Sequence, residues 1–158
     1  MIMQTNHKNT KFIISITILL LVVIIVRLFV LEDVYVSGIS MLPTYRNGET
    51  VIIRKLLYTP QRGDVVVFDS PSQTRLVKRI IGLPGDEIEI RSGIIYIDDV
   101  AIDNKYQTTD KSEAMSKIKI PENCVFLMGD NRNFSLDSRS FGPISTKFII
   151  GVVIASFE

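Results

Sequence analysis

The hydrophobic pattern divides the chain into an apolar N-terminal segment and a long mixed remainder. From Phe12 to Leu31 every residue is apolar except Ser15, Thr17 and Arg27. Such a stretch, as a helix rising about 1.5 Å per residue, spans roughly 30 Å, which is the thickness of a hydrocarbon core. The pattern therefore predicts a tail over residues 1–11, a single transmembrane anchor over residues 12–31 and a separate domain over residues 32–158.

A cleaved secretory signal is the rival interpretation of the apolar segment. The apolar region of such a signal runs for only about 7–15 residues before a small-residue cleavage site. Here the run is longer, and Val30–Val34 contains no small-x-small pattern. A retained anchor is therefore favoured, with Arg27 near its outer end able to snorkel to the interface.

The charges that flank the apolar segment predict its orientation. Lys8 and Lys11 precede it without an acidic neighbour, and Glu32 and Asp33 follow it. Basic flanks stay cytoplasmic, so we expect a single-pass protein of the cell membrane with a cytoplasmic N-terminus and an extracytoplasmic domain.

The composition of the outer part excludes several classes of function. All 17 acidic residues and 15 of the 18 basic residues follow the apolar segment, and this near-balance argues against a nucleic-acid partner. The outer part is long enough for one domain with its own core. Cys124 is the only cysteine and no histidine lies beyond the span, so no intramolecular disulfide, metal site or cofactor is expected.

Short runs of β-branched and aromatic residues alternate with turn residues, which predicts a mainly β domain built on a twisted, partly closed sheet. A tight hairpin is expected at Ser92-Gly93 and a turn at Leu83–Asp86. Asn104–Lys117 is polar without a clear period, so we interpret it as an exposed loop and assign it no role. The predicted strands are Val34–Ser37, Thr50–Lys55, Asp64–Asp69, Leu76–Ile81, Glu87–Arg91, Ile94–Ile97, Val125–Met128 and Phe148–Phe157.

Ser40 and Lys78 are the first candidates for chemistry. Ser40 lies between Gly38 and Pro43, a bend that could expose its hydroxyl and aim its own N–H at a developing oxyanion. Lys78 interrupts an apolar run in a predicted strand. From their neighbouring residues alone, Ser40 is better interpreted as a turn residue, and Lys78 as a lysine on the solvent-exposed face of a strand. In the functional reading, burial lowers the Lys78 pKa at a cost of about 3–4 kcal/mol, so that its neutral amine can act as a base without histidine.

A polar cluster spans residues 129–143 and contains a glycine near each end. It contains two acids and two arginines, of which Asp137 and Arg139 could pair and hold the loop. Ser135 or Ser138 could orient an amine. Composition alone does not distinguish this cluster from a polar surface loop.

Four segments in order resemble the motif boxes of bacterial type I signal peptidases, including their spacing behind an N-terminal anchor. The resemblance covers nearly all of the outer domain and is closest to the shorter, single-anchor enzymes of the Gram-positive type. The four segments are Ser40–Thr44, Arg62–Phe68, Lys78–Asp86, and Gly129–Arg132 through Ser138-Arg139.

The resemblance implies a membrane-bound serine endopeptidase with a largely β core, which removes signal peptides from exported preproteins. It implies Ser40 as the nucleophile, Lys78 as the general base and Ser135 as the hydroxyl that orients the lysine. Arg79, Asp137 and Arg139 match supporting positions of the family. The implied partners are signal peptides with small residues at P1 and P3, the lipid bilayer and a secretion translocon.

Gly38 is the departure that matters. Some family members carry a serine or threonine there, whose hydroxyl completes the oxyanion hole. We therefore expect the hole to be formed by the backbone of Ser40 and Gly38, and Gly38→Ser to be tolerated or helpful. The adjoining Met41-Leu42 pair is expected to reach the membrane interface.

The mechanism expected is an acyl-enzyme route, with the substrate bound as an added β-strand. Two alternatives stay open at this stage. One is another serine–lysine protease, of the conjugative-transfer or self-cleaving repressor type. The other is a non-catalytic anchored β module.

Overall fold

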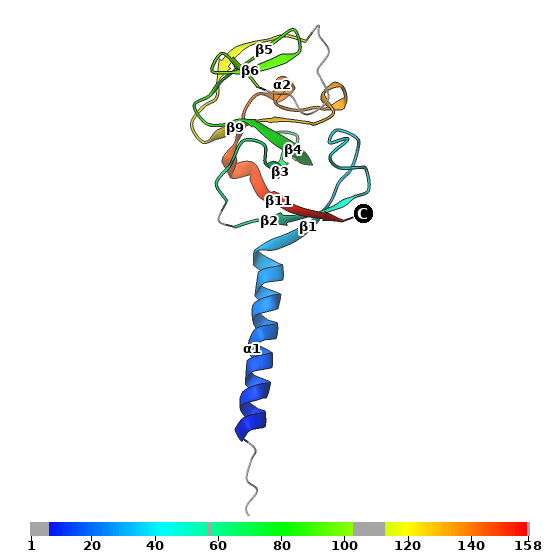
Figure 1. Ribbon diagram of the computed structural model, residues 1–158, viewed down its shortest axis with the longest axis vertical. Helices are drawn as coiled ribbons and strands as arrows, with labels where there is room; N and C mark the ends of the chain where they lie inside the picture. Colours follow the sequence, from blue (N-terminus) through cyan, green and yellow to red (C-terminus); the bar gives the residue numbers. More distant parts are fainter. Residues whose placement is uncertain (1–6, 57, 103–112, 158) are drawn as a thin grey trace, which may run out of the picture.

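Helix α1 (His7–Phe29) projects from one end of the β domain in the computed structural model, which describes residues 7–56, 58–102 and 113–157 (Figure 1). Its segment Thr10–Arg27 has a mean hydropathy of 2.4 and no buried residue, so it is long and apolar enough to cross a membrane. The helix ends two residues before the predicted end of the anchor. At the C-terminal end of the helix, the Arg27 guanidinium donates to both Asp33 oxygens, at 3.3 and 2.9 Å.

The larger sheet is antiparallel and has the strand order β1-β2-β11-β3-β4-β9-β10. β-Bulges interrupt the pairing of β11 with β2 and β3, and of β4 with β9. Because bulges bend a strand and increase its twist, the sheet curls into a half-barrel. Its strands are β1 (Leu31–Tyr35), β2 (Thr50–Arg54), β3 (Val65–Asp69), β4 (Arg75–Gly82), β9 (Cys124–Met128), β10 (Ile144–Ser145) and β11 (Ile149–Phe157), with the short 3-10 helix η2 (Thr146–Phe148) between the last two.

A smaller antiparallel sheet lies at the end of the domain away from α1 (Figure 1), with the order β7-β6-β5-β8. The predicted hairpin joins β5 to β6, with φ values of 51° at Ser92 and 76° at Gly93. Gly85 (φ 88°) lies in the predicted turn, where the Asp86 N–H donates to the Leu83 carbonyl. Both turn predictions are confirmed. The strands are β5 (Glu87–Arg91), β6 (Ile94–Ile97), β7 (Val100–Ala101) and β8 (Met115–Lys119).

The predicted strands are all present, but the prediction of a loop over Asn104–Lys117 is wrong at its end. Met115 to Lys117 belong to β8, which pairs with β5, while residues 103–112 lie outside the described part. β8 is mostly exposed, so it lacks the apolar alternation that marks a half-buried strand. β1 also begins three residues earlier than predicted, because Leu31–Asp33 already pair with β2.

Three buried clusters form the core. The first contains Val34, Val36, Val51 and Ile53 and lies on one side of the large sheet. The second joins the small sheet to β9, and the third contains Val66 and Phe68. Cys124 is half-buried against the second cluster. Met41 belongs to the first cluster and is only 1% exposed, so the expectation that it reaches the membrane interface is wrong.

Candidate active site

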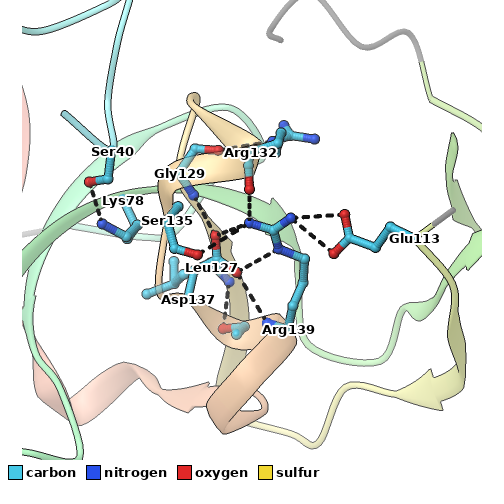
Figure 2. A network of polar contacts seen from close by, with 10 residues as sticks. Ser40, Lys78, Glu113, Leu127, Gly129, Arg132, Ser135, Asp137 and Arg139 are labelled. Carbon is cyan, nitrogen blue, oxygen red and sulfur yellow. Dashed lines mark hydrogen bonds and ion pairs between the residues drawn. The ribbon is translucent and has the colours of Figure 1, made fainter. Parts of the chain in front are cut away.

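Ser40 lies in the turn between β1 and β2, and Lys78 lies in the middle of β4. The Lys78 Nζ donates to the Ser40 Oγ at 2.7 Å (Figure 2) and to the Val77 carbonyl at 3.0 Å. Lys78 pairs with Val66 of β3 and is only 3% exposed. The interpretation of Lys78 as a residue on a solvent-exposed face is wrong, because β4 is an inner strand of the sheet and is buried on both faces from Val77 onward.

Burial sets the electrostatics of this pair. Desolvation lowers the pKa of the Lys78 amine from 10.5 to about 8, against the charges of Asp137 and Asp130, which act to raise it. With a pKa of about 8, about a tenth of the amine is neutral at pH 7, roughly 300 times more than for an unperturbed lysine. The amine can therefore accept a proton from the hydroxyl to which it is bonded.

The polar loop of residues 129–139 packs directly against Ser40. The Asn131 N–H donates to the Ser40 carbonyl at 2.9 Å, and the Asn131 side-chain amide donates to the Ile39 carbonyl at 3.1 Å. At Gly129 an added Cβ would come within 3 Å of both the Ser40 carbonyl and the Ser135 hydroxyl. A glycine is therefore required where the two segments meet.

Three buried side-chain atoms in the described part of the chain have no hydrogen-bond partner, and all three belong to this loop. They are Asn131 Oδ1, Arg132 Nη1 and Ser135 Oγ. An unsatisfied buried polar atom costs about 1–3 kcal/mol, so such a cluster points to a functional site. Ser135 Oγ makes no hydrogen bond to Lys78, and its expected role in orienting the lysine stays a prediction. Ser138 Oγ accepts from the Leu127 N–H at 2.9 Å, which leaves it a structural role.

Asp137 and Arg139 form the pair that the sequence suggested. Asp137 is fully buried, accepts from Arg139 Nε at 2.8 Å and from the Gly129 N–H at 3.0 Å, and caps the short helix α2 (Ser138–Phe141). The Arg139 guanidinium also donates to the Arg132 carbonyl at 2.7 Å and to both Glu113 oxygens at 3.0 Å. Arg139 thus joins the two ends of the loop to each other and to Glu113, two residues before β8 (Figure 2).

Arg79 forms a second buried ion pair, with Asp130. Its Nε and Nη2 donate to the two carboxylate oxygens at 2.8 and 2.6 Å, and its Nη1 donates to the Gly63 carbonyl at 2.6 Å. The Thr44 hydroxyl donates to the same carboxylate at 2.5 Å. Sequence reasoning named Arg79 but missed Asp130, Thr44 and Glu113 as partners. Asp130 and Thr44 stand in the motif segments, whereas no sequence signal marks Glu113.

A narrow groove includes both Ser40 and Lys78 in its lining. It has a volume of about 100 Å³ and is lined by residues 34–37 and 75–78 together with Ser40 and Met41. β1 is an edge strand, and β9 pairs with β4 only from Arg79 onward, so both walls present unpaired strand edges. A larger cavity of about 990 Å³ lies between β11 and residues 55, 56 and 58–60, and includes neither Ser40 nor Lys78 among its lining residues.

The backbone around Ser40 corrects one expectation. The Gly38 N–H donates to the Asn47 side-chain oxygen at 2.8 Å, so it is not available as an oxyanion donor. The Ser40 N–H makes no hydrogen bond within the described residues. Gly38 has φ 90°, so Gly38→Ser is strained even though no atom lies within 4 Å of an added Cβ.

Comparison with known proteins places the chain in a family. Residues 9–157 match the family model described as signal peptidase, peptidase S26. The signal peptidase I of Bacillus caldolyticus is 36% identical over 149 residues, covering 84% of this chain and 82% of that protein. The signal peptidase I P of Bacillus subtilis subsp. natto is 37% identical over 153 residues, covering 87% and 83%. The crystal structure of a signal peptidase I from Enterococcus faecalis is 33% identical with a TM-score of 0.54, covering 62% of this chain and 99% of that one. The chain therefore belongs to peptidase family S26, the signal peptidases, which are serine endopeptidases that remove signal peptides.

Proposed function

We propose that the chain removes signal peptides from exported preproteins with Ser40 as the nucleophile and Lys78 as the general base. The observation that carries this assignment is the 2.7 Å hydrogen bond between the two side chains, with the lysine 3% exposed. Burial supplies the lowered pKa that a lysine base needs, and the bond supplies the geometry of proton transfer. Since His7, the only histidine, precedes the apolar segment, imidazole has no part in this site.

The reaction proceeds in two halves. Neutral Lys78 takes the Ser40 proton as Oγ attacks the scissile carbonyl, and the oxyanion formed is stabilised by the Ser40 N–H. The lysine then gives its proton to the departing amine, which leaves an ester between Ser40 and the signal peptide. Lys78 next takes a proton from water, whose oxygen attacks the ester, and returns a proton to Ser40 Oγ. The Ser135 hydroxyl, buried and without a partner, orients the amine between these steps.

The groove suits an extended peptide. A strand added between the edges of β1 and β4 would satisfy their unpaired backbone groups and bring its carbonyl to Ser40. A volume of about 100 Å³ admits only small side chains, which supports small residues at P1 and P3. Signal peptides therefore bind as a third strand that bridges the two walls.

The anchor places this site at the membrane surface. We infer a cytoplasmic tail over residues 1–11, a span over residues 12–31, of which α1 provides all but the last two, and an extracytoplasmic peptidase domain over residues 32–158, oriented by Lys8 and Lys11. Only one residue separates α1 from β1, so the domain is held close to the outer leaflet, where the apolar part of a signal peptide ends. A secretion translocon is a further partner in this arrangement.

Cleavage of a purified preprotein by the full-length protein in detergent micelles tests the assignment. Ser40→Ala and Lys78→Arg should both abolish processing, because arginine keeps the charge but cannot act as a base at neutral pH. Lys119→Arg, an exposed position on β8, serves as the matched control and should cleave like the wild type. Processing by Lys78→Arg at the native rate would show that the lysine is not the base. Self-cleavage without preprotein processing would favour another class of serine–lysine protease.

A further inference from the structure

Two large apolar side chains project from the 129–139 loop, one on each side of Ser135. Phe134 and Leu136 are each 65% exposed, whereas Arg132 and Asp137 nearby are buried. Leaving a phenylalanine and a leucine in water forgoes the stabilisation that their burial would give, and adjacent exposed apolar groups often mark a contact surface.

The loop that holds these side chains is fixed by hydrogen bonds. Within the 3-10 helix η1 (Arg132–Phe134) and its entry, the Phe134 N–H donates to the Asn131 carbonyl at 3.0 Å. Asn131 is itself bonded to the Ser40 carbonyl, and Arg139 donates to the Arg132 carbonyl at 2.7 Å. Phe134 and Leu136 are therefore held outward by a preorganised loop that touches the nucleophile.

The path of the substrate leads from the groove to this loop. No residue of the 129–139 loop lines the groove, whereas Ser40 and Lys78 both do. With the scissile carbonyl at Ser40 Oγ, one side of the substrate fills the groove and the other continues past Ser40. The narrow groove suits the small side chains that precede the scissile bond. We therefore assign the residues that follow the bond to the side of Ser40 where the Asn131 N–H donates to the Ser40 carbonyl, which is the side of the 129–139 loop.

We propose that Phe134 and Leu136 form an apolar contact for the first residues after the scissile bond, and that they favour preproteins with an apolar side chain there. This inference rests on the proposed role of Ser40 as the nucleophile. The contact serves acylation only, since the mature chain departs as the amine when the acyl-enzyme forms. Deacylation and the recognition of the signal peptide itself do not use it.

Three substrates that share every residue up to the scissile bond test the proposal. The first carries two apolar residues after the bond, the second carries two polar residues, and the third is an ester with a small alcohol as its leaving group. We expect the wild-type protein in micelles to prefer the first over the second by about tenfold in kcat/KM, a usual effect of one apolar contact. The double variant Phe134→Ser/Leu136→Ser should lose this preference and hydrolyse the ester at the native rate.

Val100→Ser is the matched control, because Val100 is 67% exposed on β7, a strand of the small sheet. It should keep the preference. A double variant that still discriminates would overturn the proposal, and so would an equal loss on all three substrates, which would mean that the loop has collapsed. A loss seen only in vesicles and indifferent to the residues after the bond would identify a bilayer contact instead. A wild type that cleaves all three without preference overturns this inference alone, whereas cleavage by Ser40→Ala overturns the assigned nucleophile as well.

Discussion

Replacing Lys78 by methionine should make the protein more stable at neutral pH, in a way that depends on pH. The folded protein holds the Lys78 amine at a pKa of about 8, below its value of 10.5 in the unfolded chain. Between these two values the unfolded state binds more protons than the folded state, so the stability of the wild type rises with pH there. Below pH 8 the burial of the charged amine costs its full amount, and above pH 10.5 the cost is gone.

The size of the effect follows from the two pKa values. A difference of 10.5 against about 8 corresponds to about 3 kcal/mol, since each unit is worth about 1.4 kcal/mol. The variant also loses the hydrogen bonds from Nζ to Ser40 and Val77, each worth about 1 kcal/mol at any of these pH values. At a single pH, the difference in unfolding free energy between the two proteins combines the cost of the buried charge with the loss of the hydrogen bonds. The change of this difference with pH reports the cost of the buried charge alone.

The assay is urea unfolding of the full chain in mild detergent, for the wild type and Lys78→Met, at several pH values from 7 to 10.5. We expect the wild type to gain about 3 kcal/mol relative to the variant over this range. Other groups titrate alike in both proteins and cancel in the comparison. A difference that does not change with pH would refute a lowered pKa, and with it the argument that burial prepares the base. Correspondingly, kcat/KM of the wild type should rise with pH and level off above a midpoint near pH 8.

Three further changes test the surroundings of the site. Gly38→Ser and Gly38→Ala should each lower the unfolding free energy by about 1–2 kcal/mol because of the positive φ. The difference in kcat between the two variants measures the effect of the added hydroxyl, and equal kcat values would show that the hydroxyl does not reach the oxyanion. Arg79→Met should destabilise the protein by about 3–5 kcal/mol by leaving Asp130 buried and unpaired, and Asp130→Leu in the same chain should recover most of that loss in urea unfolding; simply additive losses would contradict this. Glu113→Gln should cost about 1–2 kcal/mol and lower kcat more than it raises KM, because Arg139 loses a bidentate partner. Unchanged steady-state kinetics would show that the Glu113–Arg139 contact does not support the loop.

The elements whose pattern is local could be predicted from the sequence. β5 and β6 have the predicted bounds, because the alternation in Glu87–Arg91 and the Ser92-Gly93 turn depend only on neighbouring residues. β8 was missed because it is held by backbone pairing to β5 and lies mostly in solvent, so its side chains carry no strand signal. Its strand character comes from the partner rather than from its own sequence.

In the candidate site, the sequence indicated the reacting residues but not the contacts that surround them. The resemblance pointed to Ser40 and Lys78, but no local pattern indicated that both faces of β4 are covered, which decides the lysine's burial. The backbone of Gly38 was expected to help form the oxyanion hole. Its N–H donates instead to Asn47, nine residues later, and this contact depends on how the turn between β1 and β2 folds back. Glu113 lies 26 residues before Arg139 in a stretch without any motif, so only the folded chain reveals their contact.

The two buried ion pairs around Lys78 resolve a conflict within the site. Asp130 and Asp137 are fully buried and hold the backbone next to Ser40, but a bare carboxylate near the amine favours its charged form. Each carboxylate is paired bidentately with an arginine, Arg79 for Asp130 and Arg139 for Asp137. The positive charge of each arginine opposes the field of its carboxylate, and the raising effects of Asp137 and Asp130 on the Lys78 pKa are smaller than the lowering effect of desolvation. The arginines thus allow the carboxylates to fix the geometry while the desolvation of Lys78 still determines its pKa.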